Sequence, residues 1–303
     1  MNTKYNFDIE QMKWDYIING YTYEQIAASY GCTRERIRQV LAGVGLHPRS
    51  GFLGTALHGK LDKFKTQYRI LSDFFAEIDN ELVAYWLGFI FADGYIGQQE
   101  NHYLFGICLK DTEIEHLYQF RRDIDSNHPI RIMPDYHYAQ IYVPDQDFIS
   151  HLLKWGVTPR KSLTIQWPDN LPSPMVRHFI RGVMDGDGGM MKPGKQDRLP
   201  ICEVAASGSP IFLESLQTEL RKRGIISAYR PAYIKDGTLT NCAGIRVHRN
   251  SDKVTLFRLL YTGATRYLDR KLNWWRHCQG DAWVQQVLNA DPIEIEQLGL
   301  CLF

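Results

Sequence analysis

Two short segments with the same pattern constrain the fold of this chain more than any other feature. The first reads Trp86-Leu-Gly-Phe-Ile-Phe-Ala-Asp-Gly94, and the second reads Ile180-Arg-Gly-Val-Met-Asp-Gly-Asp-Gly188. In this alignment Asp93 falls on Asp187, 94 residues later (187 − 93). A single Asp-Gly helix end is common, because glycine supplies the left-handed residue that stops a helix. Two in register, each followed by a similar stretch of chain, indicate an internal duplication with one acidic residue in each half.

The small residues of the two segments predict that their helices pack together. Gly88 and Ala92 lie four residues apart, as do Gly182 and Gly186. Residues at this spacing share one face of a helix. Because no large side chain stands on that face, two helix backbones can approach closely, as in small-xxx-small pairs. We therefore expect Gly88 and Gly182 to lie at a helix–helix interface.

Each helix would end in an aspartate, which is an unfavourable place for a carboxylate. The negative end of the helix dipole opposes the charge by about 0.3–1 kcal/mol, and two such carboxylates close together repel each other. Divalent cations would remove both problems, since Mg²⁺ binds through one or two carboxylates plus waters and substrate phosphates. The alternative is a pair of unrelated Asp-Gly helix ends with no shared site.

These segments resemble the LAGLIDADG motif, and residues 76–278 look like a single-chain homing endonuclease with two such motifs. The resemblance implies an α+β fold of tandem αββαββα halves with pseudo-twofold symmetry. It also implies that Mg²⁺ (or Mn²⁺) is bound by Asp93 and Asp187 and by the backbone carbonyls of Ala92 and Gly186. One departure is Phe91, where the family often has the first aspartate of the motif and the second half keeps Asp185.

Hydrolysis of a phosphodiester also needs basic residues, which polarise the attacking water or stabilise the charged phosphorane. The family places one at the end of the second strand of each half, which Lys110 matches. Its counterpart falls in Ala206-Ser-Gly-Ser209, which carries no amine, so the two active sites are expected to be unequal. Lys161 and Lys271 are related by the duplication and match the later lysines of the family. The alternative for each is an ordinary surface charge.

A separate helical unit is expected over residues 8–46. Gly31 breaks one helix and Thr33 can cap the next, whose sequence resembles the recognition helix of sigma-factor and resolvase-type helix-turn-helix units. Its outward positions, which would contact base edges or phosphates, are Thr33, Arg34, Glu35, Arg38 and Gln39. The alternative is an ordinary helical hairpin whose charged residues form a solvated face.

A basic, glycine-containing linker follows this unit. Its positive side chains would follow DNA phosphates, and the alternative is a flexible solvated tether. These side chains are Arg49, Lys60, Lys63 and Lys65.

The sequence as a whole predicts four segments, two of which are similar halves. Residues 1–47 form the helix-turn-helix domain, 48–75 the linker, 76–168 the first half and 169–303 the second half with a C-terminal extension. In the first half we expect strands over 95–97, 103–109, 130–133 and 138–143, with helices over 111–124 and 145–155. In the second we expect strands over 201–206, 226–234 and 244–248, with helices over 210–223, 252–261 and 266–276. A further helix is expected near Trp283, and its function is not indicated.

One face of each sheet would lie on DNA. Alternation along the strands places a set of polar side chains opposite the core-facing ones. A solvated sheet face would show the same pattern. The set is Tyr138, Gln140 and Tyr142 in the first half and Arg246 and His248 in the second.

Composition excludes several other classes of protein. The six cysteines include no C-x-x-C pair, which suits a cytosolic protein without a disulfide framework or structural zinc. The N-terminus has no apolar signal region, and no long uncharged apolar run is present. Neither end has the residues of an intein, so the chain is expected to be free-standing. The net charge of +1 does not by itself identify a nucleic-acid-binding protein.

The sequence therefore predicts a monomeric, metal-dependent endonuclease that cuts both strands of a long asymmetric duplex DNA site. The resemblance implies cleavage across the minor groove with 3′ overhangs, and a pseudo-twofold single chain needs no dimer to reach an asymmetric target. Two alternatives remain: a DNA-binding transcriptional regulator of this fold that does not cut, and an intron maturase that acts on folded RNA.

Overall fold

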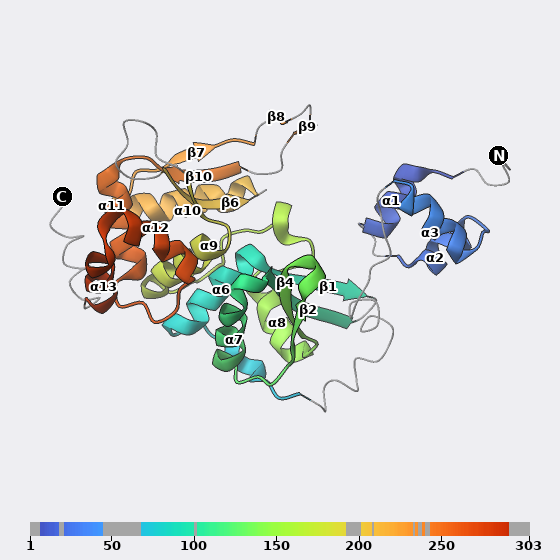
Figure 1. The fold of residues 1–303 in the computed structure, drawn as a ribbon, viewed down its shortest axis with the longest axis horizontal. Coiled ribbons are helices and arrows are strands. Elements are labelled where there is room, and N and C mark those ends of the chain that lie inside the picture. Colours follow the sequence, from blue (N-terminus) through green and yellow to red (C-terminus); the bar gives the residue numbers. More distant parts are fainter. Residues whose placement is uncertain are drawn as a thin grey trace. The chain divides into compact units, whose positions relative to one another are not determined.

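The computed structural model describes residues 7–17, 21–44, 68–99, 102–191, 201–207, 209–232, 234–235, 238–239 and 243–290 (Figure 1). The chain divides into two compact units, Met1–Phe64 and Lys65–Phe303. The linker residues Arg49, Lys60, Lys63 and Lys65 lie outside the described residues. Each unit is described by itself.

The first unit contains the helices α1 (Ile9–Ile17), α2 (Tyr23–Ser29) and α3 (Arg34–Ala42). They enclose a small core that includes the buried side chains of Met12, Ile26, Ile37 and Leu41. Gly31 has a φ of 59°, and this left-handed residue ends the helical segment between α2 and α3 as predicted. The predicted cap is also confirmed, because the Thr33 hydroxyl accepts a hydrogen bond of 3.3 Å from the Arg36 amide.

The second unit begins with a 3₁₀ turn, η1 (Ser72–Phe75), and the first half follows it. Its elements are α6 (Glu81–Asp93), β1 (Gly94–Gln99), β2 (His102–Lys110), α7 (Ile114–Asp123), β3 (Ile130–Met133), β4 (Tyr138–Val143) and α8 (Gln146–Lys154). The strands form one antiparallel sheet in the order β1-β2-β4-β3. Phe74 and Phe75 are buried in the core of this unit, so its packed part begins before residue 76.

The second half repeats this plan. Its elements are α9 (Val176–Gly186), β5 (Gly189–Met191), β6 (Ile201–Ser207), α10 (Pro210–Lys222), β7 (Ala228–Arg230), β10 (Ala243–Val247) and α11 (Asn250–Tyr261). The sheet order β5-β6-β10-β7 matches that of the first half strand for strand. The predicted α+β fold of tandem αββαββα halves is therefore confirmed.

Some local expectations were wrong. The strand expected over 226–234 is two short strands, β7 and β8 (Ile234–Lys235), and β8 pairs with β9 (Thr238–Leu239). The helix expected from residue 266 is α12 (Asp269–Gln279), which begins three residues later. The helix expected near Trp283 is α13 (Asp281–Asn289).

The glycines that end the motif helices also differ from expectation. Gly94 has φ −76° and ψ 156°, and Gly188 does not have a positive φ either, so neither is a left-handed stop. Instead, they avoid a collision. A Cβ on Gly188 would lie 2.4 Å from the carbonyl oxygen of Met184, and one on Gly94 would lie 2.9 Å from that of Ile90.

The core fills the space between the two halves and beneath each sheet. The strands bury Phe105, Ile107, Ile141 and Val143 on the core side of the first sheet. Figure 1 shows α6 and α9 crossing at the centre of this unit, where the two halves meet. Within the described residues, no helix is both long and apolar enough to span a membrane.

Candidate active site

Two glycines hold the motif helices α6 and α9 in direct backbone contact. A Cβ added to Gly88 would lie 2.0 Å from the carbonyl oxygen of Phe179, and one added to Gly182 would lie 2.0 Å from that of Tyr85. Such distances exclude any side chain at either position. The predicted helix pair is therefore present, and it sets the C-terminal ends of the two helices beside each other.

Asp93 and Asp187 lie at these adjacent ends. Asp93 is the last residue of α6, and Asp187 is the C-cap of α9. A Cβ on Gly186 would lie 2.4 Å from the Ala92 Cβ and 3.2 Å from Oδ2 of Asp93, so the Asp93 carboxylate reaches the opposite helix. Both aspartates are partly buried. The structure thus brings together two carboxylates that are 94 residues apart (187 − 93) in the chain.

Their surroundings favour the protonated form of both carboxylates. Burial raises the pKa of Asp93. Burial and the neighbouring charge of Asp93 raise the pKa of Asp187 to about 7, and Lys161 and Lys271 oppose this rise. Desolvation and like charge are the two effects that shift a carboxyl pKa upward. Two ionised carboxylates at these positions therefore destabilise the folded protein, and a bound cation would offset that effect.

Lys161 and Lys271 lie near this pair of carboxylates. Lys161 is 7% exposed, and its ammonium group donates to the carbonyl oxygens of Phe91, at 2.7 Å, and Ala92, at 3.1 Å. Lys271 is 4% exposed and donates to the carbonyl oxygen of Gly188. Burial lowers the pKa of both lysines. Each lysine therefore binds the C-terminal end of the motif helix of its own half.

The two lysines affect the pKa values of the two aspartates unequally. Lys271 lowers the pKa of Asp93 more than Lys161 does. Conversely, Lys161 lowers the pKa of Asp187 more than Lys271 does. Each of these two aspartates is therefore compensated most strongly by the lysine of the other half, and Lys271 is also stabilised in its charged form by Asp185 of its own half.

Lys110, in contrast, is exposed at the end of β2. Within the part of the chain that the structure describes, its side chain makes no hydrogen bond or ion pair. A different pair, missed from the sequence, lies closer: Arg270 forms an ion pair with Glu113, and both charges act on Asp93. The only local signal for Arg270 was its position next to Lys271.

The donor set of the site suits a hard divalent cation. Carboxylate and backbone carbonyl oxygens are the ligands that Mg²⁺ prefers, with waters and phosphates completing the shell. Asp93, Asp187 and the carbonyls of Ala92 and Gly186 could supply such oxygens. Among the described residues, no group of three or more His, Cys, Asp or Glu side chains could hold a metal ion. The two carboxylates would therefore act with backbone oxygens rather than within a larger side-chain cage.

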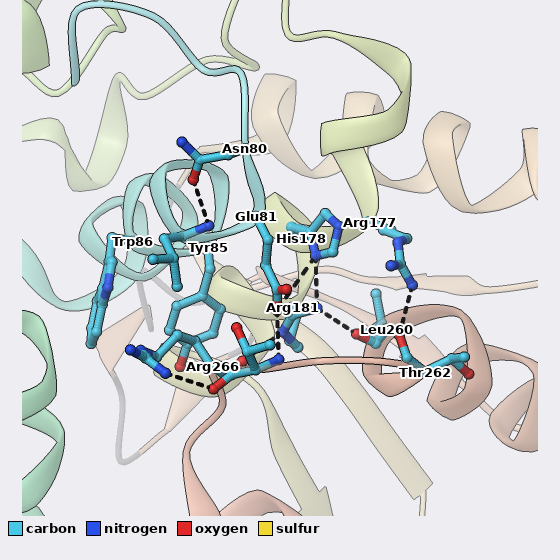
Figure 2. Close-up of polar contacts among 12 residues, drawn as sticks. Asn80, Glu81, Tyr85, Trp86, Arg177, His178, Arg181, Leu260, Thr262 and Arg266 are labelled. Carbon is cyan, nitrogen blue, oxygen red and sulfur yellow. Dashed lines mark hydrogen bonds and ion pairs between the residues drawn. The ribbon is translucent and has the colours of Figure 1, made fainter. Parts of the chain in front are cut away.

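A buried ion pair also joins the two helices, from the first residue of α6 to the middle of α9. Arg181 of α9 is completely buried and donates to Glu81 of α6 at 2.6 Å. Its other nitrogens donate to the carbonyl oxygens of Leu260 and Arg266, at 2.7 and 2.8 Å. Figure 2 shows this guanidinium between Glu81 and Leu260. The helix pair is thus held by this ion pair as well as by its glycines.

The outer faces of the two sheets differ in chemistry. In the first half, Gln140 and Tyr142 are each only 7% exposed, and the Tyr142 hydroxyl donates to Gln140 at 2.9 Å. In the second half, Arg246 and Arg230 both donate to Glu203, at 3.1 and 2.9 Å. Tyr138 is partly buried and His248 is exposed. The predicted alternation is present, but the first sheet offers less polar surface than expected.

The predicted DNA-contacting side chains of the first unit are exposed on α3 and its cap. Arg38 forms an ion pair with Glu35 at 2.5 Å, and Arg34 forms one with Glu24 at 3.3 Å. These pairs are solvent-exposed and contribute little to stability. The arginine side chains could therefore exchange their carboxylate partners for phosphates at small cost. The remaining predicted positions, also exposed, are Thr33 and Gln39.

Proteins similar to this chain are found among solved structures. No family model and no curated protein matches the sequence. The chain is similar to the LAGLIDADG meganuclease I-AabMI bound to uncleaved DNA, with a TM-score of 0.46 and 11% identity over 74% of this chain and 100% of that one. Variants of the homing endonuclease I-DmoI give a TM-score of 0.45 and 15% identity, over 68% and 98% of the two chains. Full-length WhiA from Thermatoga maritima gives 0.41 and 14%, over 75% and 69%.

Proposed function

We propose that this chain is a site-specific endonuclease that cuts both strands of duplex DNA with a divalent cation. The pairing of Asp93 and Asp187 supports this most directly. Two partly buried carboxylates at adjacent helix ends destabilise a folded protein unless a ligand binds them. Strongly perturbed carboxyl groups beside buried lysines are typical of sites that carry chemistry.

Four oxygen donors of this chain would hold Mg²⁺ or Mn²⁺: the carboxylates of Asp93 and Asp187 and the carbonyls of Ala92 and Gly186. When bound, the cation supplies Lewis-acid polarisation of a phosphoryl oxygen. The ammonium groups of Lys161 and Lys271 lie beside the same carboxylates and can stabilise negative charge that develops on a phosphate. Low exposure strengthens that effect, because water screens buried charges less.

The surfaces around the site supply DNA contacts in this proposal. The outer faces of the two sheets would lie along a long duplex, with Arg246 and His248 on one and Tyr138 on the other. The exposed residues of α3 would extend the footprint as a helix-turn-helix unit, and the basic linker would follow phosphates. Since the sheet faces of the two halves differ, the target would be asymmetric, and one chain would suffice.

A second candidate function is binding of DNA without cleavage, as a transcriptional regulator. One observation favours it: the Ala92 carbonyl already accepts a hydrogen bond from the ammonium group of Lys161. A lysine that neutralises this helix end could replace a metal ion rather than assist one. The two candidates therefore differ in whether divalent metal is needed at Asp93 and Asp187.

A cleavage assay with a charge-matched control separates these functions. The full chain is incubated with a randomised duplex library and Mg²⁺, and the DNA ends are sequenced. Discrete double-strand breaks are expected for the wild type, and none for the double variant Asp93→Asn, Asp187→Asn. The control Asp147→Asn, Asp169→Asn removes the same charge from exposed positions and should cut like the wild type.

Selection of bound DNA from the same library distinguishes a regulator from an inactive preparation. Retention of one sequence without cleavage, equal in the wild type and in the double variant, would contradict the endonuclease and support the regulator. If the wild type and the Asp93→Asn, Asp187→Asn variant both cleave DNA, the metal site is elsewhere, and the assignment of Asp93 and Asp187 is wrong.

A further inference from the structure

Asp185 accepts hydrogen bonds from three different elements at the centre of the second unit. Its side chain is completely buried on α9. The hydroxyl groups of Tyr85 on α6 and Tyr261 on α11 donate to it, at 2.9 and 2.6 Å, and the backbone amide of Leu268 donates at 2.7 Å. A carboxylate has two acceptor oxygens, so one side chain can accept from several donors at once.

The contact with Leu268 fixes the start of α12. Leu268 is the N-cap of that helix, and its carbonyl oxygen accepts from the Lys271 amide at 2.8 Å. Lys271 is thus one turn beyond the anchored residue, and its ammonium group reaches Gly188. Arg270, from the same turn, pairs with Glu113 of the first half. The position of Asp185 therefore determines where two cationic groups stand beside Asp93.

The first half has no such anchor at the equivalent position. Phe91 stands there, and its ring packs edge-on against Phe179, with centroids 5.0 Å apart. Lys161 is carried instead by a short 3₁₀ turn, Lys161–Leu163, which follows the left-handed residue Arg160. The two lysines are therefore held in place by different means.

We propose that Asp185 is a positioning residue that acts through Leu268 and the first turn of α12 on Lys271. Its carboxylate accepts from Tyr85, Tyr261 and the Leu268 amide rather than from Lys161 or Lys271. Resting on the proposed endonuclease function, the inference adds that loss of Asp185 impairs the cleavage of one DNA strand more than the other. Lys271 would lose its position while Lys161 keeps its own.

Chemical labelling of the lysines tests the positioning without nuclease activity. Brief acetylation of the full chain with an N-hydroxysuccinimide ester is followed by mass spectrometry of the peptides that contain Lys161 and Lys271. In Asp185→Asn one amide oxygen must serve three donors, so the acetylation rate of Lys271 is expected to rise about tenfold. That of Lys161 should remain within about twofold of the wild type.

Tyr261→Phe is the matched control. It removes one hydrogen bond from Asp185 but leaves the contact with Leu268, so Lys271 should be labelled at nearly the wild-type rate. Equal acceleration of both lysines in Asp185→Asn, or of Lys271 in both variants, would show general loosening and overturn the proposal. An unchanged Lys271 would overturn it as well.

Two further measurements complete the test. If Asp185→Asn does not fold, hydrogen exchange of the Leu268 amide in the wild type decides: strong protection is expected, and exchange as fast as in an exposed loop contradicts the anchor. With a cleavable target, strand-resolved nicking should show one strand slowed about tenfold relative to the other. Equal slowing contradicts strand selectivity. A wild type that retains one DNA sequence and never cuts it contradicts the endonuclease function but leaves the labelling result valid.

Discussion

The ammonium nitrogen of Lys161 lies 3.1 Å from the carbonyl oxygen of Ala92, the residue directly before Asp93. A cation at a helix C-terminus is stabilised by the carbonyl dipoles there. The same ammonium group lowers the pKa of Asp187 more than any other residue does. One lysine thus binds the motif helix of the first half and compensates the aspartate of the second.

Replacement of Lys161 by Met should test this double role, since Met keeps most of the side-chain volume and removes the charge. We expect the pKa of Asp187 to rise above about 7, because its main compensating charge is lost. We expect single-turnover cleavage to fall by about 10²–10³, the usual effect of removing one stabilising donor. The measurement is the rate of strand cleavage at saturating enzyme.

Lys154→Met provides the control for this change, since Lys154 is exposed on α8. Its cleavage rate should equal that of the wild type. If Lys161→Met also cleaves at the wild-type rate, the lysine has only a structural role at the helix end.

The raised pKa of Asp187 predicts an unusual dependence of stability on pH. Between its ordinary value of 3.8 and about 7, the folded protein holds a proton that the unfolded chain has released. The free energy of unfolding therefore decreases as pH rises through this window. The total effect is on the order of 1–4 kcal/mol at most, and it should vanish in Asp187→Asn. Chemical denaturation in chelator, from about pH 4 to about pH 8, measures it.

Divalent metal should reverse this loss. At about pH 8 the ionised pair binds the cation, so Mg²⁺ is expected to stabilise the wild type and not the variant. If the free energy of unfolding depends on pH in the same way in the wild type and in Asp187→Asn, the pKa of Asp187 is not raised in the folded protein.

The parts of the site that could be predicted from the sequence are those encoded by local spacing. The four-residue spacing of Gly88 and Ala92 predicts the helix interface, and the duplication identifies Asp187 as the partner of Asp93. Lys161 and Lys271 were predicted from the resemblance to the family together with the duplication, since both lie far from the motifs in the sequence.

Contacts between distant segments left no such signal. The amide of Leu268 donates to Asp185, 83 residues earlier, and Arg270 pairs with Glu113, 157 residues away. No periodicity encodes pairs of this kind. The burial of some side chains also could not be predicted from the sequence. Alternation places Gln140 and Tyr142 on the outer face of their sheet, but their mutual hydrogen bond and low exposure depend on neighbouring side chains.

Gly88 should be far more sensitive to substitution than a glycine of the neighbouring sheet. In Gly88→Ala the new Cβ would lie 2.0 Å from the backbone oxygen of Phe179, which cannot rotate away. We expect a loss of at least about 2 kcal/mol in the free energy of unfolding, because the helices must separate. Gly97→Ala is the control, since the nearest atom to its Cβ lies at 3.8 Å. Equal denaturation midpoints for the two variants would mean that the helices do not pack this closely.

Glu81→Gln should be among the most destabilising changes that leave the site itself untouched. Arg181 is completely buried, and Glu81 is the carboxylate that balances its charge, at 2.6 Å (Figure 2). Removal of one partner leaves an uncompensated buried charge, which typically costs about 3–5 kcal/mol. Equilibrium denaturation by urea, followed by tryptophan fluorescence, measures the loss.

The matched control is Glu115→Gln, which breaks the exposed ion pair with Arg122 in the same unit. Solvent screens such a pair, so its loss should cost less than about 1 kcal/mol. If the two variants lose similar stability, water must reach Arg181, and the junction between the halves is looser than its hydrogen bonds imply. A large loss for Glu81→Gln alone would mean that this buried pair helps to hold α6 and α9, and with them Asp93 and Asp187, in register.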